Sequence, residues 1–257
     1  MGALKVFLTG ASSGIGEALA REYAAQGAIL GLVARKRDKL EAFAASLPGA
    51  GHLALVADVG DPDAMRDAAE RFIAVHGLPD VVIANAGISV GVQTEYPEDY
   101  AVFESVLRTN VLGPFATFQP FVSAFRARGS GTLVGIASCA GFRGLPGAGA
   151  YSASKAGVIR YLEALRGELY GSGVAVVTIV PGYIRTPLTA VNPYRMPFLI
   201  DAEEAARRFI RAISRRISYT VIPWPMAIVM RLLLIAPNWL FDRIFSRTKR
   251  KPRKLPT

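Results

Sequence analysis

The chain has 257 residues, 51% of them hydrophobic, and a formal net charge of +10. This length and composition predict one large α/β domain with a buried core and exclude a mostly disordered chain. A single cysteine, Cys139, excludes an internal disulfide and fits a reducing compartment; the two histidines lie far apart, so no metal site is predicted.

Basic charge is concentrated near the C-terminus. Residues 201–257 hold 13 of the 30 Lys and Arg residues but only 4 of the 20 acidic residues. The remainder is nearly neutral, which argues against a nucleic-acid-binding function for the whole chain. The N-terminal stretch turns polar at Thr9, too early for a signal peptide, and Val6 breaks the myristoylation pattern, so we expect cytoplasmic residence.

Hydrophobic runs of strand length alternate with segments of helical spacing along the chain. The predicted strands are 4–8, 28–34, 52–57, 79–87, 131–138, 174–182 and 218–223. The predicted helices are 16–27, 36–47, 61–77, 98–108, 111–128, 150–170 and 201–216. This order predicts a single α/β domain with a Rossmann-like, doubly wound parallel sheet. We place that domain at residues 1–222 and assign residues 223–257 to a C-terminal helical extension that is not an independent domain.

A glycine-rich turn, TGASSGIG at residues 9–16, joins the first predicted strand to the first helix. Glycines at positions 10, 14 and 16 permit a tight turn and let the backbone approach a pyrophosphate. The free N–H groups and the positive end of the following helix would hold that anion. The position of the turn therefore indicates a dinucleotide-binding site.

The end of the second strand predicts which cofactor is preferred. Arg35, Lys36 and Arg37 follow that strand, and no acid stands at its end. An acid there would accept hydrogen bonds from a free ribose 2′-hydroxyl, whereas Arg35 favours a 2′-phosphate, and Ser12 could add a hydroxyl. We expect NADP(H) to be preferred over NAD(H). The alternative is a helix start with solvated basic residues.

Tyr151 and Lys155 lie four residues apart at the start of a predicted helix, which puts a phenol and an ammonium on one face. This spacing alone is common by chance, but seven motifs occur in order, and with them residues 4–222 resemble the short-chain dehydrogenase/reductase family. The motifs are TGASSGIG at 9–16, DV at 58–59, NAG at 85–87, Asn110 in RTNVLG, Ser138 in GIASCAG, YSASK at 151–155 and PGYIRT at 181–186.

The resemblance implies an oxidoreductase that transfers a hydride between a nicotinamide cofactor and a carbonyl or alcohol substrate. Tyr151 would be the general acid of reduction or the base of oxidation, its pKa of about 10 lowered by Lys155 and the oxidised nicotinamide. Lys155 would also bind the nicotinamide ribose. Ser138 would orient the substrate oxygen, and Asn110 would hold a water that links Lys155 to a proton relay.

The resemblance also assigns cofactor contacts. The matched residues near positions 58 and 85 would surround the adenosine half, and those after position 180 would contact the nicotinamide end. The implied cofactor-binding set is Gly10, Ser12, Ser13, Gly14, Ile15, Gly16, Arg35, Asp58, Val59, Asn85, Ala86, Gly87, Tyr151, Lys155, Pro181, Gly182, Ile184 and Thr186.

The segment after the sixth strand, residues 183–200, is apolar with few charges and would contact the substrate. Ser138, Tyr183, Phe142 and Leu188 are the predicted substrate residues. The apolar character suggests a lipophilic ketone or alcohol. The alternative is a mobile lid that packs its own apolar residues.

The extension is apolar at first and then basic, with prolines and Arg231 interrupting its hydrophobic stretch. These interruptions argue against a membrane-spanning helix. Two interpretations stay open. Residues 223–254 could dock on an anionic membrane surface, or they could pack on a neighbouring subunit or cover the chain's own pocket. The family resemblance further implies a homo-oligomer, a dimer or tetramer, formed through helices near 98–128 and 150–171.

Two other functions compete with the enzyme. One is a regulator or scaffold that senses NADPH without turnover, and the intact set of Ser138, Tyr151, Lys155 and Asn110 argues against it. The other is a nucleic-acid binder that uses the basic run RTKRKPRK, which lacks interleaved aromatic residues and any recognisable binding module.

Overall fold

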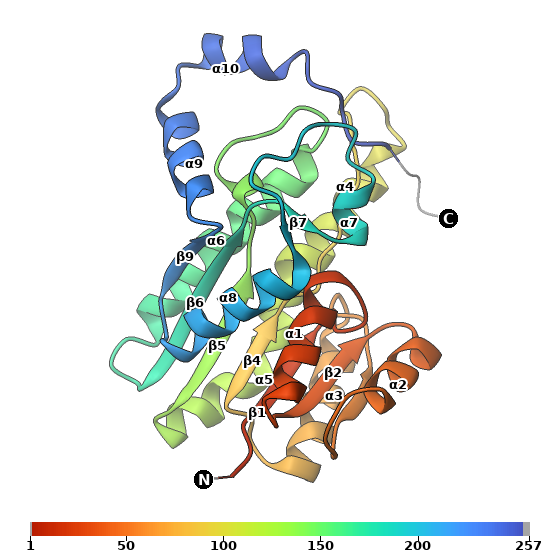
Figure 1. Cartoon of the computed structure of the whole chain (residues 1–257), viewed down its shortest axis with the longest axis vertical. Coiled ribbons are helices and arrows are strands. Elements are labelled where there is room, and N and C mark those ends of the chain that lie inside the picture. The colour runs from red at the N-terminus through yellow and green to blue at the C-terminus, as the bar shows by residue number, and fades with distance from the viewer. Residues whose placement is uncertain (1, 254–257) are drawn as a thin grey trace.

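Seven parallel strands form the central sheet of the computed structural model, which describes residues 2–253 (Figure 1). Their order across the sheet is β3-β2-β1-β4-β5-β6-β9. The predicted parallel α/β architecture is therefore confirmed. The strands are β1 (Lys5–Thr9), β2 (Ile29–Ala34), β3 (Leu53–Val56), β4 (Val81–Ala84), β5 (Gly131–Ile136), β6 (Val174–Pro181) and β9 (Tyr219–Ile222).

Helices cover both faces of the sheet because successive strand side chains point to opposite faces. Val6 and Leu8 belong to one hydrophobic cluster and Phe7, between them, to the other. The first cluster packs against α1 (Gly14–Ala25), α2 (Arg37–Ala45) and α8 (Ala202–Ser214). The second packs against α3 (Pro62–His76), α5 (Gly113–Arg128) and α6 (Gly149–Glu168).

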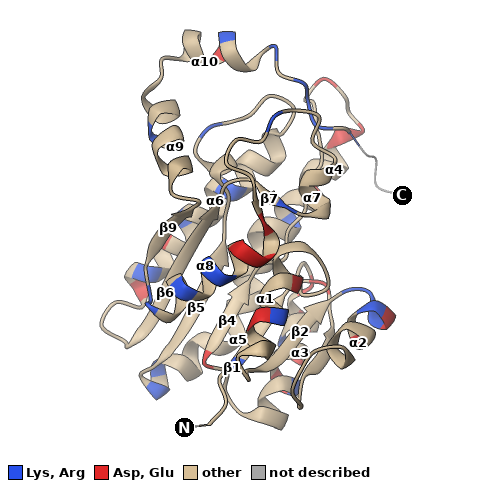
Figure 2. Ribbon diagram, viewed as in Figure 1, with Lys and Arg blue, Asp and Glu red and all other residues tan. Residues whose placement is uncertain are grey.

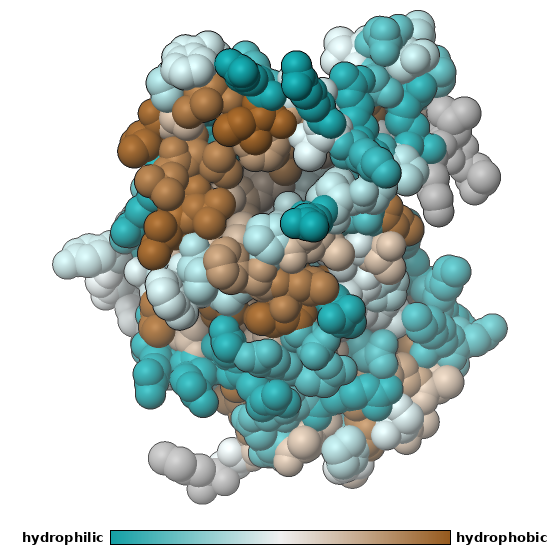
Figure 3. Space-filling model, turned by 45° about the horizontal axis from the view of Figure 1, so that its top comes forward, coloured by the Kyte–Doolittle hydropathy of each residue, from teal (hydrophilic) through white to brown (hydrophobic). Residues whose placement is uncertain are grey.

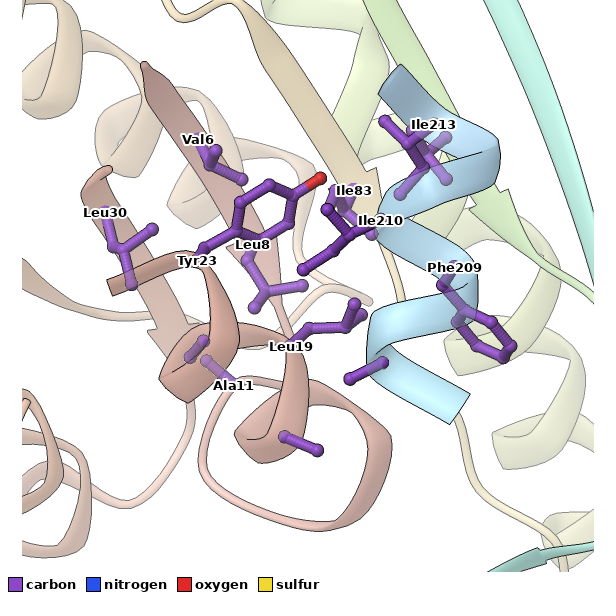
Figure 4. Close-up of a cluster of buried hydrophobic side chains, with 14 of the residues drawn as sticks. Val6, Leu8, Ala11, Leu19, Tyr23, Leu30, Ile83, Phe209, Ile210 and Ile213 are labelled. Atoms are coloured by element: carbon purple, nitrogen blue, oxygen red, sulfur yellow. The ribbon is translucent and has the colours of Figure 1, made fainter. Parts of the chain in front are cut away.

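The first of these clusters joins the beginning and the end of the domain. Figure 4 shows Leu19 and Tyr23 of α1 between β1 and the side chains of α8. Phe209, Ile210 and Ile213 supply the α8 side of this contact and are almost fully buried. The apolar residues of α8 thus pack on the same face of the sheet as α1, beside β1, the strand that leads into the glycine turn.

Helix α3 begins as its sequence predicts. The carboxylate of Asp61 accepts hydrogen bonds from the backbone N–H groups of Asp63 (3.0 Å) and Ala64 (3.1 Å), and Pro62 takes the first helical position. This cap satisfies two of the N–H groups that an isolated helix start leaves free.

The two predicted helices around position 110 form one continuous rod. α4 (Asp99–Leu107) leads into a π-helical turn, Arg108–Leu112, and then directly into α5. A π-turn inserts one extra residue per turn without ending the helix, which is why the sequence pattern shifts there. It places the buried Asn110 on the inner side of the rod.

Short elements occupy the predicted substrate segment. β7 (Ile184–Arg185) pairs in parallel with β8 (Ile200–Asp201), and α7 (Pro187–Ala190) lies between them. A 3-10 turn, Cys139–Gly141, follows β5. The sequence pattern predicts none of these elements, since each is too short to show periodicity.

The C-terminal extension consists of α9 (Pro225–Ile235), α10 (Asn238–Phe245) and a tail over residues 246–253. Met226, Met230 and Phe241 bury one side of the two helices against the domain. The tail then crosses the top of the molecule towards α4 and α7, and its basic residues follow that path (Figures 1 and 2). Within residues 2–253, no helix is both long and apolar enough to cross a membrane.

Arg143 holds the junction between α9 and α10. Its guanidinium donates to the carbonyl oxygens of Leu233 (2.8 Å) and Ala236 (2.9 Å) and to Oδ1 of Asn238 (2.9 Å), and it lies 4.2 Å from the ring centroid of Phe241. These bonds satisfy carbonyl groups that the end of α9 would otherwise leave free.

We expect Arg143→Ala to loosen the extension while the sheet stays intact, because the domain core does not use this side chain. Amide hydrogen exchange in residues 233–245 should speed up by at least about tenfold, with β1 and β4 unchanged. Arg160→Ala is the control, since Arg160 is an exposed arginine paired with Glu163. Unchanged exchange in α10 would contradict this role of Arg143.

Candidate active site

The strand order reverses between β1 and β4, and a crevice opens there at the carboxyl ends of the strands. The hydroxyl oxygen of Thr9, at the end of β1, accepts from the backbone N–H groups of Asn85 (3.1 Å) and Ala86 (3.2 Å), just beyond β4. The side-chain amide of Asn85 donates to the carbonyl oxygen of Thr9 (2.9 Å) in return. These bonds fix the two walls of the crevice relative to each other.

The glycine turn leaves no room for side chains. Gly10 has a φ of +66°, and a Cβ there would lie 2.8 Å from Cα of Ala86. A Cβ at Gly16 would collide with the carbonyl oxygen of Gly10, and Gly14 has a φ of +56° beside Thr186. Only glycine permits this backbone conformation and these close approaches, so the turn stays open to a ligand.

A cavity of about 440 Å³ follows the crevice. Most of the residues predicted for the cofactor, together with Ser138 and Leu188, line it. Those residues are Gly10, Ser12, Ser13, Gly14, Ile15, Arg35, Asp58, Val59, Asn85, Ala86, Gly87, Ser138, Tyr151, Lys155, Pro181, Gly182, Ile184, Thr186 and Leu188.

Four predicted site residues do not line this cavity. Gly16 lies inside α1, where it lets the helix approach Gly10. Asn110 lies behind the wall, and Tyr183 packs edge-to-face on Tyr194 with ring centroids 6.4 Å apart. Phe142 lines a separate hollow beside α6.

The residues at the crevice fit a dinucleotide. Ser13, the N-cap of α1, makes no side-chain cap bond, so the first N–H groups of that helix are available to an anion. The glycines leave space in front of those groups. Arg35, Lys36 and Lys39 line the cavity at the end of β2. A pyrophosphate at the turn and a further phosphate near β2 would each meet positive charge there.

An ion pair at the β2 end binds Arg35 only loosely. Its Nη1 atom is 3.7 Å from a carboxylate oxygen of Asp58, both side chains are largely exposed, and Asp58 also accepts from the backbone N–H of Gly60 (2.9 Å). Arg37, which the sequence groups with Arg35, instead pairs with Glu41 at 3.1 Å. Exposed pairs of this kind contribute little stability, so Arg35 is free to turn towards a phosphate.

The proton-transfer residues lie together at the β5 side of the crevice. Tyr151 and Lys155 occupy the first turns of α6, and Lys155 Nζ lies 5.9 Å from the ring centroid of Tyr151. Lys155 Nζ donates to the carbonyl oxygen of Ile136 (2.8 Å), and Ser138 follows β5 and hydrogen-bonds Tyr151. Because β2 and β5 lie on opposite sides of β1 and β4, this group is at the far end of the crevice from Arg35.

Burial changes the acidity of both residues. It raises the pKa of Tyr151 above its usual value, and the hydrogen bond from Ser138 opposes that shift only in part. Burial lowers the pKa of Lys155 to about 8. Burial therefore opposes the acidification of the phenol that we expect from Lys155 together with an oxidised nicotinamide.

Asn110 fixes the loop after β4 through its whole amide group. Its Oδ1 accepts from the backbone N–H of Ile88 (2.8 Å), and its Nδ2 donates to the carbonyl oxygen of Ile88 (2.9 Å) and to Oγ of Ser154 (2.9 Å). Both amide hydrogens are thus occupied. Only the second lone pair of Oδ1 remains for the predicted water.

The sequence reasoning missed several residues of the site. Lys39 lies three positions after Lys36, so helical spacing alone would place it beside the phosphate-facing residues. Ser154 lies within YSASK, but nothing in the sequence indicates that its hydroxyl accepts a hydrogen bond from Asn110. Ile88 and Thr109 also line the cavity and carry no pattern that marks them.

Comparison with known proteins shows the family of this chain. Residues 5–195 match the model of the short chain dehydrogenase family. An uncharacterised oxidoreductase of Myxococcus xanthus is 36% identical over 94% of this chain and 96% of its own. An 11-beta-hydroxysteroid dehydrogenase-like protein of Arabidopsis thaliana, 4A, is 33% identical over 93% of this chain and 82% of its own.

Solved structures share the fold. A short-chain dehydrogenase of Sphingobium yanoikuyae in complex with NADPH is 27% identical with a TM-score of 0.78 over 96% of both chains. A short chain dehydrogenase/reductase of Burkholderia phymatum in complex with NAD is 22% identical with a TM-score of 0.81 over 98% of both chains, which shows the fold alone. This chain therefore belongs to the short-chain dehydrogenase/reductase family of oxidoreductases.

Proposed function

We propose that the protein uses NADPH to reduce the carbonyl group of a lipophilic substrate, or catalyses the reverse oxidation of the alcohol. One observation carries this proposal. Ser138, Tyr151 and Lys155 line the same cavity as the glycine turn, so an acid–base group and a dinucleotide cradle face one space.

The preference for NADP(H) rests on the charge at the end of β2. Three basic side chains, Arg35, Lys36 and Lys39, line the cavity there, with Asp58 as the nearby acid. A 2′-phosphate would find two or more cations, whereas an unmodified ribose would find no carboxylate at the strand end. Structures with this fold contain either NADPH or NAD, so the fold does not decide the choice, and the proposal rests on these side chains.

The chain's own residues would handle the proton. When bound, the nicotinamide cofactor supplies or accepts the hydride. Ser138 would donate a hydrogen bond to the substrate oxygen, and Tyr151 would deliver its proton to that oxygen as negative charge develops. Lys155, held by the carbonyl of Ile136, would stabilise the phenolate that remains. A phenol whose pKa is raised by burial keeps its proton at neutral pH, which suits carbonyl reduction.

A lipophilic substrate is supported by the segment above the cavity. Leu188 lines the cavity, and Val191 and Phe198 in the same segment are half exposed. The Arabidopsis relative is described as hydroxysteroid dehydrogenase-like, which agrees with a ring system as substrate. The proposal rests on Leu188 more than on Tyr183 or Phe142, which do not line the cavity.

Two exposed apolar surfaces, one along α4 and α5 and one on α9, support contacts with other molecules. Exposed apolar side chains along α4, the π-turn and α5, among them Phe103, Leu112 and Phe115, support the proposed homo-oligomer. Ile228, Leu232 and Ile235 of α9 recur with Trp224, the residue just before it, along one exposed face. Figure 3 shows hydrophobic surface on that side of the molecule. We propose that this face meets a membrane.

Charge supports a lipid partner for α9. Arg231 in α9, Arg243 in α10 and Arg247 after it are exposed, and Asp242 is the one acid between residues 223 and 253, so an anionic lipid surface would complement this part of the chain. Packing on the chain's own domain accounts for the opposite face, through Met226 and Met230. A regulator without turnover gains no support, because the acid–base residues converge on the cavity.

Tyr151→Phe should lower kcat for NADPH-dependent ketone reduction by at least about 100-fold, because the variant cannot donate the proton. The measurement is NADPH oxidation against ketones graded by chain length and ring size. NADPH affinity within about threefold of wild type serves as the control for folding. Turnover within threefold of wild type on every substrate would reject the mechanism.

Arg35→Ser should lower kcat/KM for NADPH by about tenfold or more, while kcat/KM for NADH changes by less than threefold, because only the 2′-phosphate loses a charged hydrogen bond. Arg37→Ser is the matched control, since that side chain pairs with Glu41 outside the cavity. An equal loss with both cofactors would remove Arg35 from the explanation.

Replacement of Trp224, Ile228 and Leu232 by serine should abolish flotation with vesicles of phosphatidylcholine and phosphatidylserine. The reason is that burial of these exposed apolar side chains in the lipid would drive membrane binding. Tyr170→Ser is the control, since Tyr170 is 91% exposed and lies outside the extension. Equal flotation of the triple variant, or none for the wild type, would contradict membrane docking.

A further inference from the structure

The tail places a buried ammonium beside the cavity. The side chain of Lys251 is only 8% exposed, and its Nζ donates to Oγ of Ser89 (3.0 Å) and to the carbonyl oxygen of Leu188 (3.1 Å). Leu188 lines the cavity, and Ser89 directly follows Ile88, which also lines it. The ammonium therefore lies where the two loops that border the cavity meet.

The position of this ammonium is fixed by the backbone around it. The backbone N–H of Gly91 donates to the carbonyl oxygen of Pro252 (3.1 Å). A Cβ at Gly91 would collide with the carbonyl oxygen of Lys251, so the loop after β4 accepts the tail only because glycine stands there. Arg253 pairs with Asp99 (2.8 Å) and Glu98 (3.0 Å). Its guanidinium carbon also lies 3.6 Å from the ring centroid of Tyr96.

Lys251 is buried without an anionic partner among residues 2–253. Arg253, two positions on, meets two carboxylates, whereas no carboxylate of residues 2–253 lies within 4.0 Å of Lys251 Nζ. An ammonium has three N–H donors, and the described residues accept two. Neutral acceptors compensate poorly for the lost hydration of a charge, and burial lowers the pKa of Lys251 to about 8.

We infer that Lys251 is a specificity-determining residue that binds the carboxylate of an amphipathic substrate, whose apolar body occupies the lipophilic part of the cavity. The inference rests on the proposed function for the identity of that cavity. A carboxylate would supply the missing counter-charge and accept the third N–H. A single free donor suits one carboxylate oxygen, while a phosphate would call for several donors.

The test uses binding, so that it does not depend on turnover. Isothermal titration of the full chain with saturating NADP⁺ compares alkanoates from hexanoate to dodecanoate with the corresponding amides. We expect the wild type to bind the preferred alkanoate at least about tenfold more tightly than its amide, because only the carboxylate carries charge. Lys251→Met should remove this difference and change amide affinity by less than threefold.

Two further variants control for the basic charge of the tail and for its packing. Lys249→Met, which removes a lysine from the exposed part of the same tail, should retain the preference, and Lys251→Arg should restore most of it. Equal wild-type affinity for alkanoate and amide, no alkanoate binding, or a preserved preference in Lys251→Met would each overturn the inference and leave Lys251 as a structural latch. Loss of ketone reduction with the carboxylate preference intact would reject only the proposed reaction.

Discussion

The site depends on the hydrogen bonds that join the carboxyl ends of β1 and β4. Thr9 and Asn85 exchange backbone and side-chain hydrogen bonds where the strand order reverses, and Gly10 approaches Ala86 within the distance that only glycine allows. The available N–H groups of α1 and the residues after β5 take their places around this junction. A displacement of β4 relative to β1 would therefore disturb the phosphate end and the proton-transfer end together.

Much of the architecture follows from local patterns. Strands that are apolar on both faces, such as residues 6–8 of β1, require helices on both sides of the sheet, and the alternation of strands and helices then indicates a parallel sheet. Asp61 and Pro62 mark the start of α3 correctly because a cap is a local interaction. The glycine turn was predictable for the same reason, since its backbone demands can be read from position and spacing.

Other features depend on contacts between distant segments, and no local pattern encodes them. The bond between Asn110 and Ser154 forms only because α6, which carries Ser154, packs against the π-turn that carries Asn110. The acidity of Tyr151 depends on how completely the fold removes water, which the spacing to Lys155 cannot show. Likewise, the path of the C-terminal extension over the domain depends on Gly91, Asp99 and Arg143, which are far from it in sequence.

The route of the tail has a practical consequence. Pro252 and Arg253 end up against the loop that borders the site, whereas Lys5 opens β1 at the amino edge of the sheet, remote from the crevice. A bulky label attached at Arg253 would stand against this loop and would disturb measured kinetics. Fusion ahead of the first strand would leave that region undisturbed, which makes it the better position for purification and imaging.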